Sequence, residues 1–146
     1  MVAARATSGF VVGIDISDAM VAQARRRIAA MVRAGRVELR QAGVSRIPYP
    51  DGRFDKALAV NTYQFWPAPE DDLRELRRVL RPGGLLALGL RVRDPERPAR
   101  YNRIASSEEQ LGEIAQTVAR AGFEQAVTRR ERVRLQTAVV LLARKL

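Results

Sequence analysis

Apolar and polar positions alternate along the chain in blocks that predict strands and helices in turn. Two short apolar runs, Phe10–Ile16 and Val37–Arg40, predict buried strands. A helix is predicted between them, because Ser17 is a typical N-cap and Gly35 a typical stop. Its apolar positions recur at helical spacing: Met20, Ala24, Ile28 and Met31. The first 40 residues therefore predict strand, helix, strand.

The same alternation continues after a predicted loop at Ile47–Arg53. Strands are predicted at Phe54–Val60 and at the fully apolar Leu85–Leu90, with a helix between them that ends at the Pro82-Gly83-Gly84 break. The apolar positions of that helix are Leu73, Leu76, Val79 and Leu80. Strands that alternate with helices indicate an α/β layer fold with a mostly parallel sheet.

The last third of the chain predicts a loop, a helix and a closing strand pair. Arg91–Arg103 is charged and contains two prolines, which favours a mobile surface loop. Ser107 and Gln110 have the spacing of a helix capping box, and Gly122 ends the helix. Two segments read as an antiparallel pair: Phe123–Val133 and Thr137–Ala143. We expect one domain over residues 1–146.

Composition narrows the chemistry. The chain has 146 residues, 47% of them hydrophobic, with no cysteine and no histidine. Disulfides, thiolate metal sites and the commonest general base are therefore excluded, and no metal ligands are expected. No apolar run approaches the roughly 18 to 20 residues that span a bilayer. The N-terminal residues show no secretory pattern, so the cytoplasm is the expected compartment and no membrane partner is expected.

The net charge of +10 raises the question of an anionic partner. Residues 1–90 carry 14 basic and 9 acidic groups, and residues 91–146 carry 12 and 7. A nucleic-acid surface more often concentrates its charge on one face. The even spread disfavours a nucleic-acid partner and leaves RNA as an alternative.

Two segments carry a family resemblance. Gly9–Met20 reads GFVVGIDISDAM, and Phe54–Gly84 reads FDKALAVNTYQFWPAPEDDLRELRRVLRPGG. Together they resemble the middle of a class I S-adenosylmethionine-dependent methyltransferase of the small-molecule group called type 11. The resemblance covers residues 9–90, and its most specific string, Leu73–Gly84, has a structural role. It implies a Rossmann-like sheet and S-adenosylmethionine as the cofactor.

Asp15 is the first candidate for a binding residue. It ends a predicted strand before a capped helix, where a carboxylate accepts hydrogen bonds from the ribose hydroxyls of a nucleotide. An aspartate beside Ser17 also serves simply to cap the helix, and the spacing alone leaves both interpretations open. The resemblance implies the ribose role for Asp15 and places Ile16 against the adenine.

Three further residues follow from the resemblance. Many relatives have an acid before a small residue that contacts the adenine amino group, and that place falls on Gly43. The backbone of Gly43 and Val44 would then supply the contacts, while the bland alternative is an ordinary loop. Asn61, just past the third strand, would lie beside the methionine portion of the cofactor.

The aromatic cluster after Asn61 has two interpretations. Tyr63, Phe65 and Trp66 would line a pocket for the methyl transfer or for a substrate. Packing of Phe65 and Trp66 under the following helix is the favoured alternative.

One family element is missing from the sequence. The family sheet has seven strands in the order 3-2-1-4-5-7-6, and a Gly-x-Gly-x-Gly loop follows the central strand one. No such loop occurs here, and Met1–Ala6 resembles the tail of the helix after it. The neighbours of the central strand would then lack a partner. A longer natural protein, a decayed gene, or pairing of the exposed sheet in a homodimer would each account for this.

Three functions are compatible with these residues. The first is a methyltransferase that acts on a small molecule, with no residue standing out as a catalytic acid or base. The second is a catalytically silent relative that serves as an interaction or regulatory module, which the absent glycine loop and Gly43 favour. The third is an RNA methyltransferase, suggested by the net charge.

Overall fold

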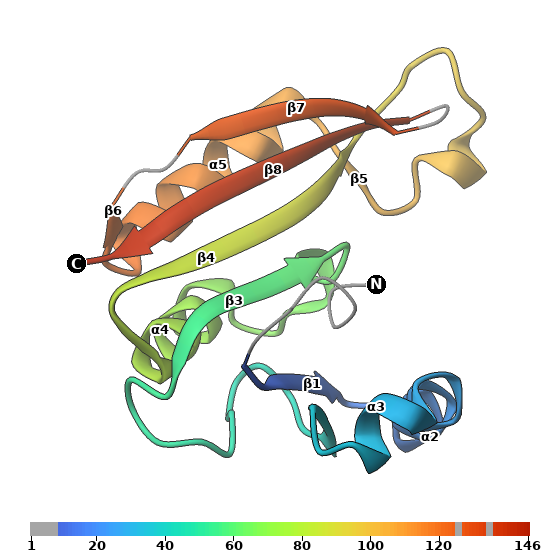
Figure 1. The fold of residues 1–146 in the computed structure, drawn as a ribbon. Helices are drawn as coiled ribbons and strands as arrows, with labels where there is room; N and C mark the ends of the chain where they lie inside the picture. Colours follow the sequence, from blue (N-terminus) through green and yellow to red (C-terminus); the bar gives the residue numbers. More distant parts are fainter. Residues whose placement is uncertain (1–8, 125–126, 134–135) are drawn as a thin grey trace. The chain divides into compact units, whose positions relative to one another are not determined.

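The structure is a computed structural model that describes residues 9–124, 127–133 and 136–146 (Figure 1). The chain divides into two compact units, Met1–Pro48 and Tyr49–Leu146. The predicted helical tail Met1–Ala6 lies outside the described residues. That residues 1–146 form a single domain stays a prediction.

The first unit is a strand–helix–strand unit, as predicted. Strands β1 (Val11–Asp15) and β2 (Val37–Gln41) are parallel, with Asp15 opposite Gln41. The predicted single helix is instead two helices, α2 (Asp18–Arg27) and α3 (Ala29–Arg33). The break is at Ile28, whose φ of −122° and ψ of 28° lie outside the helical region.

Burial in the first unit is shallow. From residue 9 onward, the buried hydrophobic residues of this unit are Val21, Val37 and Ile47. Met20 of the predicted apolar stripe is exposed, and Val21 takes the buried position instead. β1 was expected to be buried but is only half-buried, because within its unit it pairs with β2 alone.

The second unit contains a mixed sheet in the order β3-β4-β8-β6. The strands are β3 (Phe54–Val60), β4 (Leu80–Val92), β6 (Phe123–Glu124) and β8 (Gln136–Lys145). β3 and β4 are parallel, whereas β8 is antiparallel to β4. Two further strands join it, β5 (Ala105–Ser106) on β4 and β7 (Thr128–Val133) on β8. The predicted strand Phe123–Val133 is thus split into β6 and β7, which both pair with β8.

Helices α4 (Pro69–Val79) and α5 (Glu108–Arg120) belong to this unit and contact each other (Figure 1). Two 3₁₀ turns, η1 (Tyr63–Phe65) and η2 (Ala99–Tyr101), complete it. The core lies along one face of the sheet, where buried residues pair across β4 and β8: Leu86 with Ala143, Leu88 with Leu141, and Leu90 with Val139. The predicted capping box is confirmed, since the Ser107 and Gln110 side chains each accept the other's backbone N–H.

The Pro82-Gly83-Gly84 segment does not end the helix. α4 stops at Val79, and β4 begins at Leu80, opposite Phe54. The helical conformation is disfavoured for the residue before a proline. Arg81 precedes Pro82 and is therefore already extended. The pairing of β4 with β3 then shifts register between Leu80 and Leu85, where the Pro82-Gly83-Gly84 segment lies. Gly83 has a φ of +72°, and a Cβ on Gly84 would lie 2.8 Å from the Arg81 carbonyl oxygen.

Taken separately, each sheet matches one part of the expected strand order. β2-β1 corresponds to strands three and two, and β3-β4-β8-β6 to strands four, five, seven and six. Strand one of that order has no counterpart among the described residues. Within this part of the chain, β1 pairs only with β2, and β3 only with β4.

Candidate functional site

Asp15 stands at the carboxyl end of β1 and makes the turn into α2. Its Oδ1 accepts a hydrogen bond from the Ser17 backbone N–H at 2.9 Å, and the Ser17 Oγ accepts one from the Met20 N–H at 3.3 Å. The capping interpretation of Asp15 therefore has a contact of its own. The side chain is nevertheless exposed, and Oδ2 has no hydrogen-bond partner in the described part of the chain. Half of the carboxylate is thus free to accept a ligand.

The next residue, Ile16, lies beside the loop after β2. Its side chain is 75% exposed, and its carbonyl accepts a hydrogen bond from Gln41 Nε2 at 3.1 Å. A Cβ added to Gly43 would be 3.5 Å from the Ile16 Cγ2. Because β1 and β2 are parallel, their carboxyl ends meet at one edge, and the structure brings Asp15, Ile16 and Gly43 together there.

This edge has the features that the nucleoside half of S-adenosylmethionine requires. The carboxylate of Asp15 offers an acceptor for ribose hydroxyls, and Ile16 offers an exposed apolar surface for a flat ring. Gly43 and the half-buried Val44 follow in the adjacent turn, where the Gly43 carbonyl accepts the Arg46 N–H at 3.3 Å. The residues present therefore fit the cofactor, with backbone groups in place of the acid that is absent at position 43.

Asn61 belongs to the second unit and has an uncommon backbone conformation. Its φ is +53°, which is the left-handed region that asparagine tolerates better than most residues. Its N–H donates to the Gly89 carbonyl at 2.8 Å, and its carbonyl accepts from Gln64 Nε2 at 2.9 Å. The side-chain amide has no partner among the residues described. Asn61 thus ends β3 at the edge where open α/β sheets bind ligands.

The aromatic residues after Asn61 point to different environments. The rings of Tyr63 and Trp66 are 5.1 Å apart, and Trp66 is half-buried. Phe65 is 68% exposed, so the favoured prediction that it packs under the following helix is wrong. The reason is local, since Phe65 belongs to the single 3₁₀ turn η1, which has no buried residue.

Tyr63 is the one residue of this cluster with a shifted pKa. Burial raises the pKa of its hydroxyl above the usual 10.0, and a hydrogen bond with Thr117 of α5 opposes the shift. The hydroxyl is therefore protonated at neutral pH and is a hydrogen-bond donor, not a general base. Among the described residues no group of three or more acidic, histidine or cysteine side chains gathers to hold a metal.

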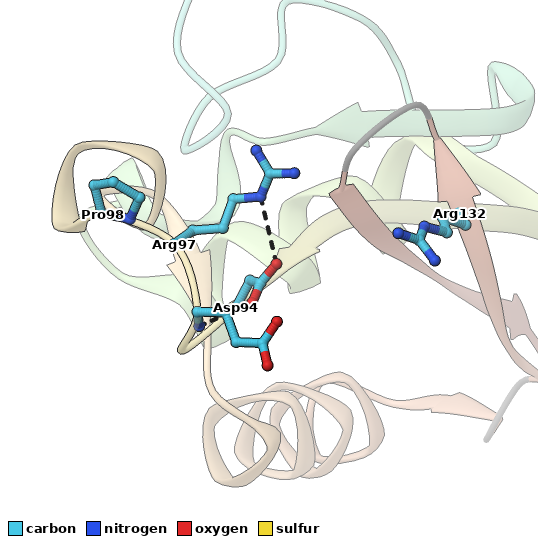
Figure 2. Close-up of a pocket in the computed structure, with 5 residues that line it drawn as sticks. Asp94, Arg97, Pro98 and Arg132 are labelled. Atoms are coloured by element: carbon cyan, nitrogen blue, oxygen red, sulfur yellow. Dashed lines mark hydrogen bonds and ion pairs between the residues drawn. The ribbon is translucent and has the colours of Figure 1, made fainter.

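The sequence identified Arg91–Arg103 as a charged loop, but no binding site was predicted among its arginines. Two hollows lie in this segment. One, of about 330 Å³, is lined by Asp94, Glu96, Arg97, Pro98 and Arg132 (Figure 2). The other, of about 440 Å³, is lined by Arg93, Arg97, Ala99, Asn102 and Arg103. The local density of arginine was the signal in the sequence that would have identified them.

Comparison with known proteins decides the family. The profile of a family described as "Methyltransferase domain" (Methyltransf_11) matches residues 1–88. The chain belongs to this methyltransferase family. The chain is thereby a member of the class I, S-adenosylmethionine-dependent family, as the two quoted motifs predicted.

Individual relatives agree with that assignment. An uncharacterized methyltransferase, YdaC, of Bacillus subtilis is 33% identical over 95 residues, which are 62% of this chain and 50% of YdaC. The 27-O-demethylrifamycin SV methyltransferase of Amycolatopsis mediterranei is 38% identical over 86 residues, or 59% of this chain and 32% of that protein. The chain thus spans half or less of the length of these curated relatives.

A solved structure extends the likeness to the whole fold. A SAM-dependent methyltransferase from Aquifex aeolicus is 25% identical and superposes with a TM-score of 0.74, covering 96% of this chain and 71% of its own. The predicted α/β, Rossmann-like methyltransferase fold is confirmed. In the part of the chain that the structure describes, no helix has the length and apolar character needed to cross a membrane.

Proposed function

We propose that the methyltransferase binds S-adenosylmethionine through Asp15, Ile16, Gly43, Val44 and Asn61 and methylates a small molecule. The observation that carries the proposal is the exposed Asp15 carboxylate beside the exposed Ile16 side chain, at the shared end of two parallel strands. Asp15 would accept the ribose hydroxyls and Ile16 would lie against the adenine. The backbone of Gly43 and Val44 would contact the ring edge.

The protein's part in the reaction would be to bind and align. The cofactor supplies an activated methyl group on its sulfonium, and alignment of the acceptor gives most of the remaining rate. Asn61 would hold the methionine portion of the cofactor. The Tyr63 hydroxyl, which is protonated at neutral pH, would serve as a hydrogen-bond donor to the bound ligand. A small-molecule acceptor is supported by the rifamycin methyltransferase, whose name states such a substrate. We propose the cytoplasm as the compartment, as the composition predicted.

A calorimetric titration with S-adenosylhomocysteine, the reaction product, tests the cofactor site. We expect micromolar binding by the chain and binding weakened about tenfold to a hundredfold in Asp15→Asn, since a charge-assisted hydrogen bond is worth about 1.5–3 kcal/mol. Asn at position 15 keeps an oxygen for the Ser17 N–H, so the turn into α2 is preserved. Asp18→Asn is the matched control, because Asp18 is also exposed and bonds only its neighbour's N–H.

Two results would overturn the proposal. One is a folded sample that does not bind the product. The other is equal weakening by Asp15→Asn and Asp18→Asn, which would leave Asp15 with its capping role alone.

The silent interaction module is the second candidate function. It is favoured by the outer edge of β3, where Leu58 and Val60 are 50% and 52% exposed in an edge strand without a second partner among the described strands. Such an edge is a template for a strand of another chain. If the chain forms a homodimer through it, analytical ultracentrifugation would give the dimer mass, and Val60→Lys would return the monomer. A monomer that binds S-adenosylhomocysteine would exclude this candidate.

A further inference from the structure

The segment after β4 is a folded loop with hydrogen bonds of its own. At its base, the Arg93 N–H donates to the Ser106 carbonyl at 2.8 Å. The Asn102 side chain makes three hydrogen bonds within the loop. Its Oδ1 accepts the Asp94 N–H at 3.0 Å. Its Nδ2 donates to the carbonyl of Asp94 at 2.8 Å and to that of Arg97 at 3.3 Å. These hydrogen bonds hold in place the backbone that carries the arginines.

This loop has a local excess of basic residues. Residues 91–103 contain five arginines, at positions 91, 93, 97, 100 and 103, and two acidic residues, Asp94 and Glu96. The equal net charge of residues 1–90 and residues 91–146 conceals this local excess. A folded loop with a surplus of guanidinium groups is a feature that selects for negative ligands.

Three of these guanidinium groups border the hollow of about 440 Å³, and no carboxylate is among its lining residues. Arg97 has an ion pair with Asp94, but its 3.5 Å separation is long. In the described part of the chain, Arg93 and Arg103 have no carboxylate partner at all. Positive charge in this hollow is therefore largely uncompensated.

The smaller hollow next to it differs in charge. Arg97 borders both, and Figure 2 shows Arg97 and Arg132 on opposite sides of the smaller one, which Asp94 also lines. The carboxylates of Asp94 and Glu96 offset its arginines. The larger hollow is thus the better oxyanion site of the two.

The position of the larger hollow connects it with Asn61. Gly89 of β4 accepts the Asn61 N–H at 2.8 Å, and Arg93 follows four residues later along the chain. At about 3.3 Å per residue the separation along β4 is about 13 Å. A small molecule held at the arginines would therefore reach toward the end of β3.

We propose that Arg93, Arg97 and Arg103 bind a phosphate or carboxylate group of the methyl acceptor, which is thus a small anionic molecule. The guanidinium fork matches both kinds of oxyanion with two parallel hydrogen bonds. The assignment of this ligand as the acceptor rests on the proposed function, whereas the oxyanion site itself does not require the cofactor.

An NMR titration of arginine Nε–Hε signals with methyl phosphate and, separately, with acetate tests the site without cofactor. We expect saturable millimolar binding of at least one probe, and the tighter probe identifies the acceptor's group. Arg93→Gln and Arg103→Gln should each weaken binding about tenfold, since each removes one charge-assisted contact. Arg103→Lys should restore part of it, which separates a loss of charge from a loss of the folded loop.

Arg53→Gln is the matched control, because Arg53 is exposed, lies in the same unit and has no ion pair among the described residues. It should change the affinity by less than about twofold. Absence of saturable shifts with both probes, or equal weakening by Arg53→Gln, would overturn the site and indicate a general attraction to the basic surface. S-adenosylhomocysteine titrated into Arg103→Gln should bind as before. A failure of that cofactor titration in the unaltered chain would count against the proposed function alone.

Discussion

The two units differ in how firmly they are packed, and the candidate cofactor residues are mostly in the weaker one. The second unit has large side chains that are fully buried, such as Leu73, Leu86 and Leu88 at 0% exposure. In its described residues the first unit has a two-stranded sheet and three buried hydrophobic residues, Val21, Val37 and Ile47. A two-stranded sheet is marginally stable by itself. The described part of the first unit is therefore expected to be the less stable of the two.

The largest effect is expected from the core of the second unit. Leu88→Ala should lower the free energy of unfolding by about 3 kcal/mol, because it leaves a cavity at a fully buried position. Urea denaturation followed by the fluorescence of the single tryptophan, Trp66, measures it. The control Leu58→Ala, at a half-exposed site on β3, should cost less than about 1 kcal/mol. Equal losses would contradict the view that β4 holds the core.

Hydrogen exchange compares the units directly. Amides of β1 and β2 should exchange about a hundredfold faster than those of β4 and β8, which corresponds to about 2.7 kcal/mol. S-adenosylhomocysteine at about 100 times its Kd should slow exchange in the first unit by a similar factor, since a ligand stabilises the state it binds. Uniform protection across both units would break the comparison.

A smaller effect is expected at Asn61. Asn61→Ala should cost about 1 kcal/mol, since alanine resists the left-handed backbone at φ +53°, whereas Asn61→Gly should be close to neutral. Both variants lose the side chain, so both should weaken S-adenosylhomocysteine binding if that amide contacts the cofactor. Urea denaturation and calorimetry separate the two effects. A glycine variant as unstable as the alanine variant would show that backbone strain is not the cause.

The smallest effect is expected from an exposed ion pair of the second unit. Arg130 of β7 donates to both carboxylate oxygens of Glu108 at 2.7 and 2.6 Å, and this lowers the pKa of Glu108 below its usual 4.5. Because the pKa of Glu108 is lower in the folded state, the ion pair stabilises the fold above the unfolded-state pKa. This stabilisation is lost as the pH falls through the folded-state pKa. Melting temperatures of the unaltered chain and Glu108→Gln should therefore differ slightly near about pH 6 and converge below about pH 4. A difference in melting temperature that persists at acidic pH would show that packing, and not the ion pair, is its cause.

Much of the fold could be predicted from the sequence because its boundaries are local. β3 spans the predicted residues Phe54–Val60, between the Asp51-Gly52 turn and Asn61, and the α5 capping box formed as expected. The split of Phe123–Val133 and the early start of β4 were missed. Both depend on pairing with strands distant in the sequence, which a periodicity does not encode.

The candidate site divides in the same way. The meeting of Asp15, Ile16 and Gly43 follows from two parallel strands ending at one edge, so it was accessible from the pattern. The exposure of Phe65 depends on the geometry of η1. The arginine hollow depends on Asn102, whose three hydrogen bonds shape the loop.

The two glycines of the Pro82-Gly83-Gly84 segment show which residues related sequences would keep if they lost methyl transfer. Gly83 is required by its left-handed backbone, and Gly84 by a carbonyl oxygen too close for a Cβ. Neither requirement involves a ligand. A copy that lost methyl transfer would still be selected to keep both glycines in order to fold, whereas Asp15 would keep only its contact with the Ser17 N–H. The most recognisable mark of ancestry in this chain is therefore a record of shape, and catalytic competence has to be read elsewhere.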